Sequence, residues 1–96
     1  MVVGTCELDF HLPGNHSLKG KRQVSRSIVQ RIRNRFNVSV AEVAELDQWQ
    51  LLSLGVVCAT NDRRHADEIL SKIVHFAEDQ ASGAVLHQCR IEVMTT

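Results

Sequence analysis

A strand-like apolar pattern gives way to helical spacing twice along this chain, first after the alternation of residues 2–12 and again after the nearly continuous apolar run of residues 51–60. A period of two is typical of a strand with one buried face, and a period of about 3.6 residues is typical of a helix with one apolar stripe. The patterns predict four strands, over residues 2–12, 38–43, 51–60 and 85–94. They predict two helices, one from Ser17 to about Phe36 and one that Asn61-Asp62 opens and Ser82-Gly83 ends.

This order of elements predicts an α+β protein. Two right-handed crossovers give a ferredoxin-like βαββαβ sandwich, a four-stranded antiparallel sheet with two helices on one face. A chain of 96 residues is long enough to bury a core without metal or disulfide bonds. We therefore expect a single domain over residues 1–96 that needs no metal and no cofactor.

The three cysteines, Cys6, Cys58 and Cys89, lie far apart and form no C-x-x-C pair. This spacing argues against a zinc site or a redox motif. Each cysteine falls within an apolar strand pattern, so we expect three buried, unpaired thiols in a reducing compartment. The start of the chain does not resemble a signal peptide, and no apolar run approaches the roughly 20 residues that span a bilayer. The expected location is the cytoplasm.

The charges of this chain are unevenly distributed, although the formal net charge is zero. No acidic residue occurs from Phe10 to Ala41, a range that contains most of the basic residues. The basic block is Lys19, Lys21, Arg22, Arg26, Arg31, Arg33 and Arg35. At about 100° per helical residue, one row lies away from the apolar stripe: Lys19, Arg22, Arg26 and Arg33. Like charges four residues apart repel by a few tenths of a kcal/mol, which suggests that they are kept for an anionic ligand.

Two interpretations of the basic block remain open. The first is a solvated helix face whose long side chains also pack on the core. The second is an anion-binding surface, with RNA as the favoured anion. Its predicted nucleic-acid contacts are Lys19, Lys21, Arg22, Arg26, Arg33 and Arg35.

Aromatic residues set a limit on how RNA could bind. The chain has no Tyr and lacks the aromatic pattern of sheet-based RNA readers. Any RNA should therefore be contacted through its backbone and shape, by the helix. Trp49 lies in the connection between two predicted strands. It is expected to cover one end of the core, with the alternative that it anchors a partner.

No catalytic arrangement can be assigned. Glu7 and Asp9 share a strand face, where they are expected to keep an open sheet face soluble. His11 and His16 flank the Pro13 loop, but two histidines five residues apart make a poor metal site. The loop lacks the glycine and lysine spacing of a P-loop. We expect no catalytic residues and no metal ligands, and an enzyme is the less favoured class.

Several short motifs are spread over nearly the whole chain: His11-Leu12-Pro13, Ser17-Leu18-Lys19, Lys21-Arg22, the run from Arg33 to Glu42, Asp47, Trp49-Gln50, and Asn61-Asp62-Arg63-Arg64. Together they resemble the YlxP-like family, a bacterial domain of unknown function (number 503). Gly20 departs from the family pattern, which usually has an acidic residue there. The resemblance implies a small ferredoxin-like cytosolic protein, often encoded beside translation-initiation and ribosome-maturation factors. It implies no catalytic residues, and its fixed basic positions match Lys19, Lys21, Arg22, Arg33 and Arg35.

The favoured hypothesis is a non-catalytic accessory protein that associates with ribosomal RNA or the small ribosomal subunit. A second hypothesis is a protein–protein adaptor that dimerises through its sheet. A third, less favoured, is an enzyme or binder of a phosphorylated small molecule that would lie at the His11–Lys21 loop. We also expect a homodimer, through the open sheet face or through edge strands. The apolar residues expected on or near that open face are Val3, Val43, Leu51, Val57, Leu86 and Met94.

Overall fold

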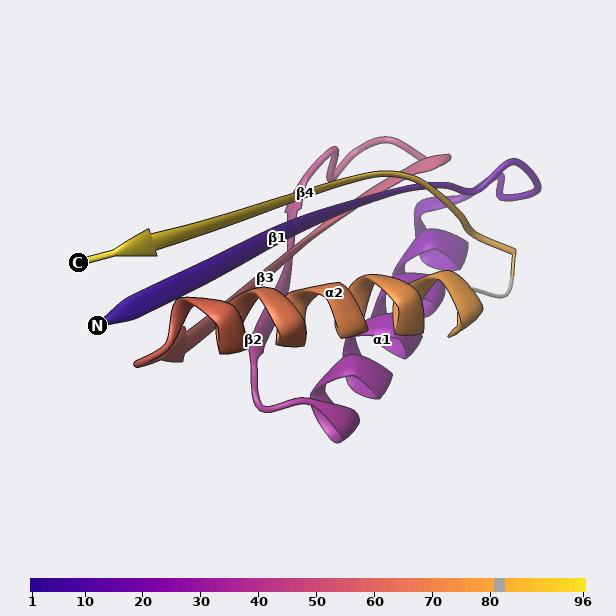
Figure 1. Cartoon of the computed structure of the whole chain (residues 1–96). Helices are drawn as coiled ribbons and strands as arrows, with labels where there is room; N and C mark the ends of the chain where they lie inside the picture. The colour runs from indigo at the N-terminus through magenta and orange to yellow at the C-terminus, as the bar shows by residue number, and fades with distance from the viewer. Residues whose placement is uncertain (81–82) are drawn as a thin grey trace.

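The computed structural model describes residues 1–80 and 83–96. Its elements follow the predicted order: β1 (Val2–His11), α1 (Leu18–Arg35), β2 (Ser39–Ala44), β3 (Leu51–Thr60), α2 (Arg63–Gln80) and β4 (Val85–Thr95). The strands form one antiparallel sheet in the order β2-β3-β1-β4, and both helices lie on one face of it (Figure 1). The predicted α+β, ferredoxin-like βαββαβ fold is confirmed. Neither helix of the described chain has the length and apolar character needed to cross a membrane.

The core lies between the sheet and the two helices. Alternate residues of β1 are buried, and Leu8 and Phe10 have no exposed surface. From the helices, Ile32 of α1 and Leu70 of α2 pack into the same cluster. Gly4 sets the distance between α2 and β1, because a Cβ atom there would lie 2.8 Å from Cδ1 of Leu70. The absence of a side chain at this position therefore lets the helix pack closely on the sheet.

The helix boundaries follow from capping side chains. Ser17 has extended backbone angles, and its hydroxyl accepts a hydrogen bond of 2.9 Å from the amide of Gly20, which confirms the predicted N-cap. A carboxylate oxygen of Asp62 accepts from the amide of Arg64 at 3.0 Å and opens α2 in the same way. Of the predicted end of α2, Ser82 lies outside the described residues, and Gly83 adopts a φ of 79°, which suits glycine.

The register of β4 differs from the one that simple alternation predicts. Asp9 pairs with Gln88 while the next residue, Phe10, pairs with Leu86, so His87 is an extra residue in a β-bulge. The bulge moves Leu86 to the helix-covered face, where it packs against the core. The expectation that Leu86 lies on the open face is therefore wrong.

The cysteine prediction is correct for two of the three thiols. Cys6 and Cys58 are buried and free, but Cys89 is exposed. Cys89 pairs with Leu8 on β4, which is an edge strand with only β1 beside it. Because β4 has a neighbouring strand on one side only, the small side chain of Cys89 is not covered from the other side and remains open to solvent.

Candidate functional site

The predicted row of cations lies along one flank of α1. Lys19, Arg22, Arg26 and Arg33 are all exposed. The flank faces β2, and between the two elements runs a shallow groove of about 290 Å³. The groove is lined by Arg22, Ser25, Arg26, Val29, Arg33, Val40, Ala41 and Glu42. Because β2 is an edge strand, a long anion could lie in this groove without displacing another strand.

Arg33 also has a structural contact within the groove. Its Nη2 donates a hydrogen bond of 2.8 Å to the carbonyl oxygen of Val40 on β2. At the other edge of the sheet, the guanidinium of Arg63 donates to the carbonyl of Val93 at 3.1 Å. Each edge strand thus has a carbonyl group that accepts from an arginine of a helix. Such contacts make an edge strand less available for pairing with another chain.

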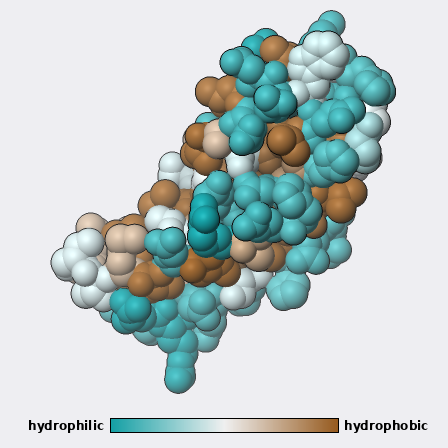
Figure 2. Space-filling view, turned by 90° about the horizontal axis from the view of Figure 1, so that it is seen from above, coloured by the Kyte–Doolittle hydropathy of each residue, from teal (hydrophilic) through white to brown (hydrophobic). Residues whose placement is uncertain are grey.

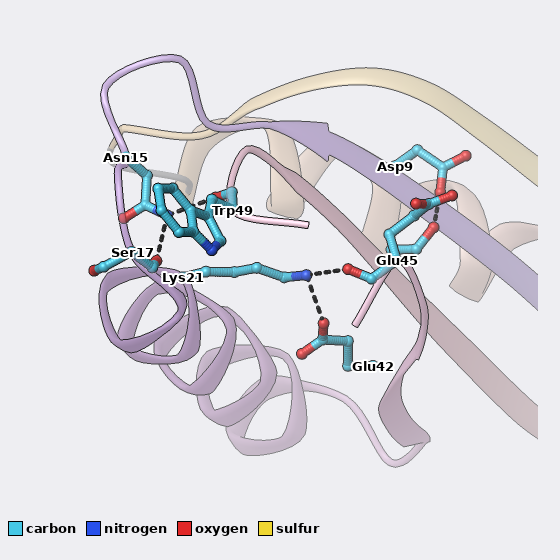
Figure 3. Close-up of polar contacts among 8 residues, drawn as sticks. Asp9, Asn15, Ser17, Lys21, Glu42, Glu45 and Trp49 are labelled. Carbon is cyan, nitrogen blue, oxygen red and sulfur yellow. Dashed lines mark hydrogen bonds and ion pairs between the residues drawn. The ribbon is translucent and has the colours of Figure 1, made fainter. Parts of the chain in front are cut away.

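Lys21 is not part of the exposed surface, which corrects its assignment as a nucleic-acid contact. Its side chain is only 1% exposed, and its Nζ lies 3.0 Å from Oε2 of Glu42 on the inner face of β2. The ammonium group also donates a hydrogen bond to the carbonyl of Glu45 (Figure 3). The sequence contained a signal for this position, since Lys21 precedes the buried Ser25 and Ile28 at helical spacing. The side chain of Lys21 therefore lies on the face of α1 that packs against the core.

Arg35 lies away from the row. Its guanidinium carbon is 5.0 Å from the ring centroid of Phe76 on α2. Phe36 and Phe76 meet edge to face, with ring centroids 5.6 Å apart. Arg35 thus lies over an aromatic contact between the helices, an arrangement typical of a cation–π interaction. The structure brings together Lys19, Arg22, Arg26 and Arg33, and it separates Arg35 from them.

Two loops meet at the N-terminal end of α1. The side-chain amide of Asn15 donates to the carbonyl of Ser17 at 2.8 Å and also to the carbonyl of Trp49 (Figure 3). The amide of Gln50 donates to the carbonyl of Asn15 at 3.2 Å, and the backbone amide of Leu12 donates to the carbonyl of Gln50 at 2.8 Å. These bonds join the segment before α1 to loop 45–50. The motif residues around positions 12–21 and 42–50 therefore have a shared structural role.

The side chain of Trp49 is 52% exposed, so the expectation that it covers an end of the core is wrong. Glu45, at the start of the same loop, adopts a φ of 58°. This left-handed conformation is uncommon for a residue other than glycine and turns the chain sharply after β2. The turn directs the loop outward, and Leu46 in it is also exposed.

The structure places the histidines of the N-terminal loop at the surface. His11 and His16 are both exposed, and Lys21, which the phosphate hypothesis placed beside them, is buried. Within residues 1–80 and 83–96, no three His, Cys, Asp or Glu side chains come together as a metal-binding group would require. The loop's polar groups are used instead in contacts with loop 45–50.

The open face of the sheet combines apolar and polar residues, which Figure 2 shows in brown and teal. At its centre, the hydroxyl of Ser53 donates to the carboxylate of Asp9, and Arg90 donates to the carboxylate of Glu7. Ser53 is 4% exposed, so this polar group is largely shielded from water. Around it lie exposed apolar side chains, those of Val43, Leu51, Val57 and Met94.

Comparison with known proteins places these features in a family. The model of a family described as "Protein of unknown function (DUF503)" matches residues 3–90, a range that includes α1, the groove and loop 45–50. The uncharacterized protein YlxP of Bacillus subtilis (strain 168) is 31% identical over 77 residues. These residues make up 80% of this chain and 84% of that protein.

Proposed function

The chain belongs to the DUF503 family of proteins of unknown function, and we propose that it is a non-catalytic accessory protein that binds RNA through α1. Ribosomal RNA or the small ribosomal subunit is the proposed partner. The observation that carries the proposal is the row of exposed cations Lys19, Arg22, Arg26 and Arg33 on a helix without acidic residues. Such a row suits a polyanion with regularly spaced charges.

The charges of the row are not neutralised by nearby acids. Among the described residues, Lys19, Arg22 and Arg26 form no ion pair, while the buried Lys21 is paired with Glu42. The groove beside the row has one carboxylate, that of Glu42, and its charge is balanced by Lys21. The electrostatic potential along this flank is therefore positive, which supports attraction of an RNA backbone.

The salt dependence of RNA binding tests the proposal. Each phosphate contact on a duplex contributes about −0.9 to the slope of log K against log salt, so engaging most of the row gives a slope of roughly −3. Sequence preference should be weak, because phosphate contacts carry no base information. The measurement is fluorescence anisotropy of a labelled ribosomal RNA fragment over a series of salt concentrations.

A charge reversal on the row should abolish this binding. The test uses the double variant Arg22→Glu/Arg26→Glu and leaves Arg33 unchanged, because Arg33 also donates a hydrogen bond to β2. A matched control is Arg64→Glu/Lys72→Glu, which makes the same change of charge at exposed positions of α2. If the row variant binds RNA as tightly as the parent at low salt, the row is only a solvated helix face and the proposal fails.

A second candidate function, an adaptor that dimerises through its sheet, is supported by the open face. Val43 is 55% exposed, Val57 45% and Met94 42%, which is much apolar surface for a small monomer. The arginine contacts at Val40 and Val93 disfavour the alternative of edge-strand pairing. This function would be favoured if the protein bound a protein partner with an affinity that changes neither with salt concentration nor in the variant Arg22→Glu/Arg26→Glu.

A further inference from the structure

The exposed indole of Trp49 is not part of the hydrophobic core. Trp49 is the only tryptophan of the chain, and its side chain is 52% exposed at the surface of loop 45–50. An aromatic face left in water forgoes the favourable free energy that its burial would provide. Hydrogen bonds hold the loop through its backbone, so the loop does not depend on the indole.

The loop holds Trp49 in a fixed position. The carbonyl of Trp49 accepts a hydrogen bond from the side chain of Asn15. The following residue, Gln50, donates to the carbonyl of Asn15 and accepts from the backbone amide of Leu12. At the start of the loop, the carbonyl of Glu45 accepts from the buried Lys21. Because the backbone at Trp49 is already held in place, only the side-chain torsions lose freedom when a flat ligand stacks on the indole.

Trp49 lies at one end of the basic row. The amide of Asn15 bonds at once to the carbonyl of Trp49 and to that of Ser17, the N-cap of α1 (Figure 3). The row begins two residues later at Lys19 and continues to Arg33, about 21 Å along the helix at 1.5 Å per residue. A nucleic-acid strand whose phosphates contact the row would therefore reach loop 45–50 at the N-terminal end of α1.

The charges of the loop indicate which part of a nucleotide would fit there. Glu45 and Asp47 belong to the same loop as Trp49 and are exposed. Two carboxylates disfavour a phosphate at this end, whereas the face of a base carries no net charge. The row thus suits the backbone, and the indole suits a base.

We propose that Trp49 stacks on one unpaired base of the RNA whose phosphates contact the row on α1. The inference rests on the proposed function and narrows its ligand to RNA in which a paired stem adjoins a single-stranded segment. A base within a duplex is covered by its neighbours, so apart from the two ends of a stem only an unpaired base offers a free face for stacking. The aromatic face accepts any base, so the preference is for RNA shape and not for sequence.

Intrinsic fluorescence and paired RNA ligands test the inference. The probes are a blunt RNA duplex and the same duplex with a short single-stranded overhang. The parent protein should prefer the overhang RNA, and that RNA should quench the emission of Trp49, which no other tryptophan obscures. Trp49→Ala should weaken binding of the overhang RNA roughly 5- to 150-fold and should affect the blunt duplex, which offers only its terminal base pairs for stacking, much less. The salt slope should change little, because the phosphate contacts remain.

The matched control is Leu46→Ala, which removes another exposed apolar side chain of the same loop and should preserve the preference. If the parent shows the salt slope but Trp49→Ala binds both RNAs like the parent, stacking is excluded and the proposed function stands. If the parent binds neither RNA at low salt, both proposals are wrong. Trp49-dependent capture of a protein with no RNA bound would show that the indole is instead a protein anchor.

Discussion

The ammonium nitrogen of Lys21 lies 3.0 Å from Oε2 of Glu42, and the lysine side chain is 1% exposed. This ion pair joins α1 to the inner face of β2, and the same ammonium group bonds to the carbonyl of Glu45 where loop 45–50 begins. One buried charge therefore holds together the helix that carries the basic row and the loop that presents Trp49. Its contribution is structural, although it lies within a run of surface cations.

Lys21→Met should destabilise the protein strongly. The change leaves the Glu42 carboxylate, which is 19% exposed, without its partner. Removing one member of a buried ion pair costs about 3–5 kcal/mol, and the partial exposure of Glu42 places the expected loss at about 3 kcal/mol, the lower end of that range. Urea unfolding followed by circular dichroism measures this loss. Lys19→Met, at an exposed neighbouring position, should change the free energy of unfolding by less than about 0.5 kcal/mol.

The double variant Lys21→Met/Glu42→Leu should recover most of the lost stability, because apolar pairs of similar volume often replace buried ion pairs without loss. A double variant as unstable as Lys21→Met would show that the bond to the Glu45 carbonyl, and not the charge of Glu42, dominates.

The three thiols should react at very different rates. Burial raises the pKa of the Cys6 thiol to about 12, with smaller contributions from Cys89 and Glu7. At pH 8, a thiol reagent should modify the exposed Cys89 rapidly and Cys6 and Cys58 only slowly. Mass spectrometry of a time course identifies the modified residue. Equal rates at all three positions would contradict the burial of Cys6 and Cys58.

The Cys6 thiol also predicts an alkaline loss of stability. Its pKa rises from an ordinary value of 9.0 to about 12 on folding, so the folded state holds the proton more tightly than the unfolded state. This contribution is fully present below pH 9 and is lost as the pH rises towards 12. Urea midpoints should fall across that window in the parent and fall less in Cys6→Ala.

Gly4→Val should destabilise the contact between α2 and β1. An added Cβ would lie 2.8 Å from Leu70 and 3.0 Å from Sγ of Cys58, and overpacking of this kind costs about 1–3 kcal/mol. The matched control is Gly14→Ala, where an added Cβ meets no atom within 4 Å. Thermal unfolding should show a clear loss for the first variant and none for the second.

Self-association through the open face should depend on Val57. Light scattering at micromolar concentration should give the mass of a dimer for the parent protein. Val57→Glu should give a monomer, because it places a charge among the exposed apolar residues. A parent protein of monomer mass would contradict the expected homodimer.

The order of the elements could be read from the sequence because each strand and helix has its own apolar period. The buried role of Lys21 could also have been found, since it lies in the apolar stripe of α1, but the density of nearby cations favoured a surface interpretation. The bulge at His87 could not be predicted from the sequence, because it depends on how β4 pairs with β1. The exposure of Trp49 could not be predicted either, because it depends on the path of loop 45–50, and the left-handed turn at Glu45, a non-glycine residue at a φ of 58°, has no sequence signature.

The tether between Arg33 and the carbonyl of Val40 has an entropic consequence for any anion that binds in the groove. A guanidinium group has five N–H donors, and this bond occupies Nη2 while other donors remain available. Immobilising a long side chain at an interface ordinarily costs about 0.5–1.5 kcal/mol. The hydrogen bond to Val40 already restricts the side chain of Arg33 in the free protein, so less conformational entropy is lost when an anion binds. The guanidinium group is therefore preorganised for its ligand.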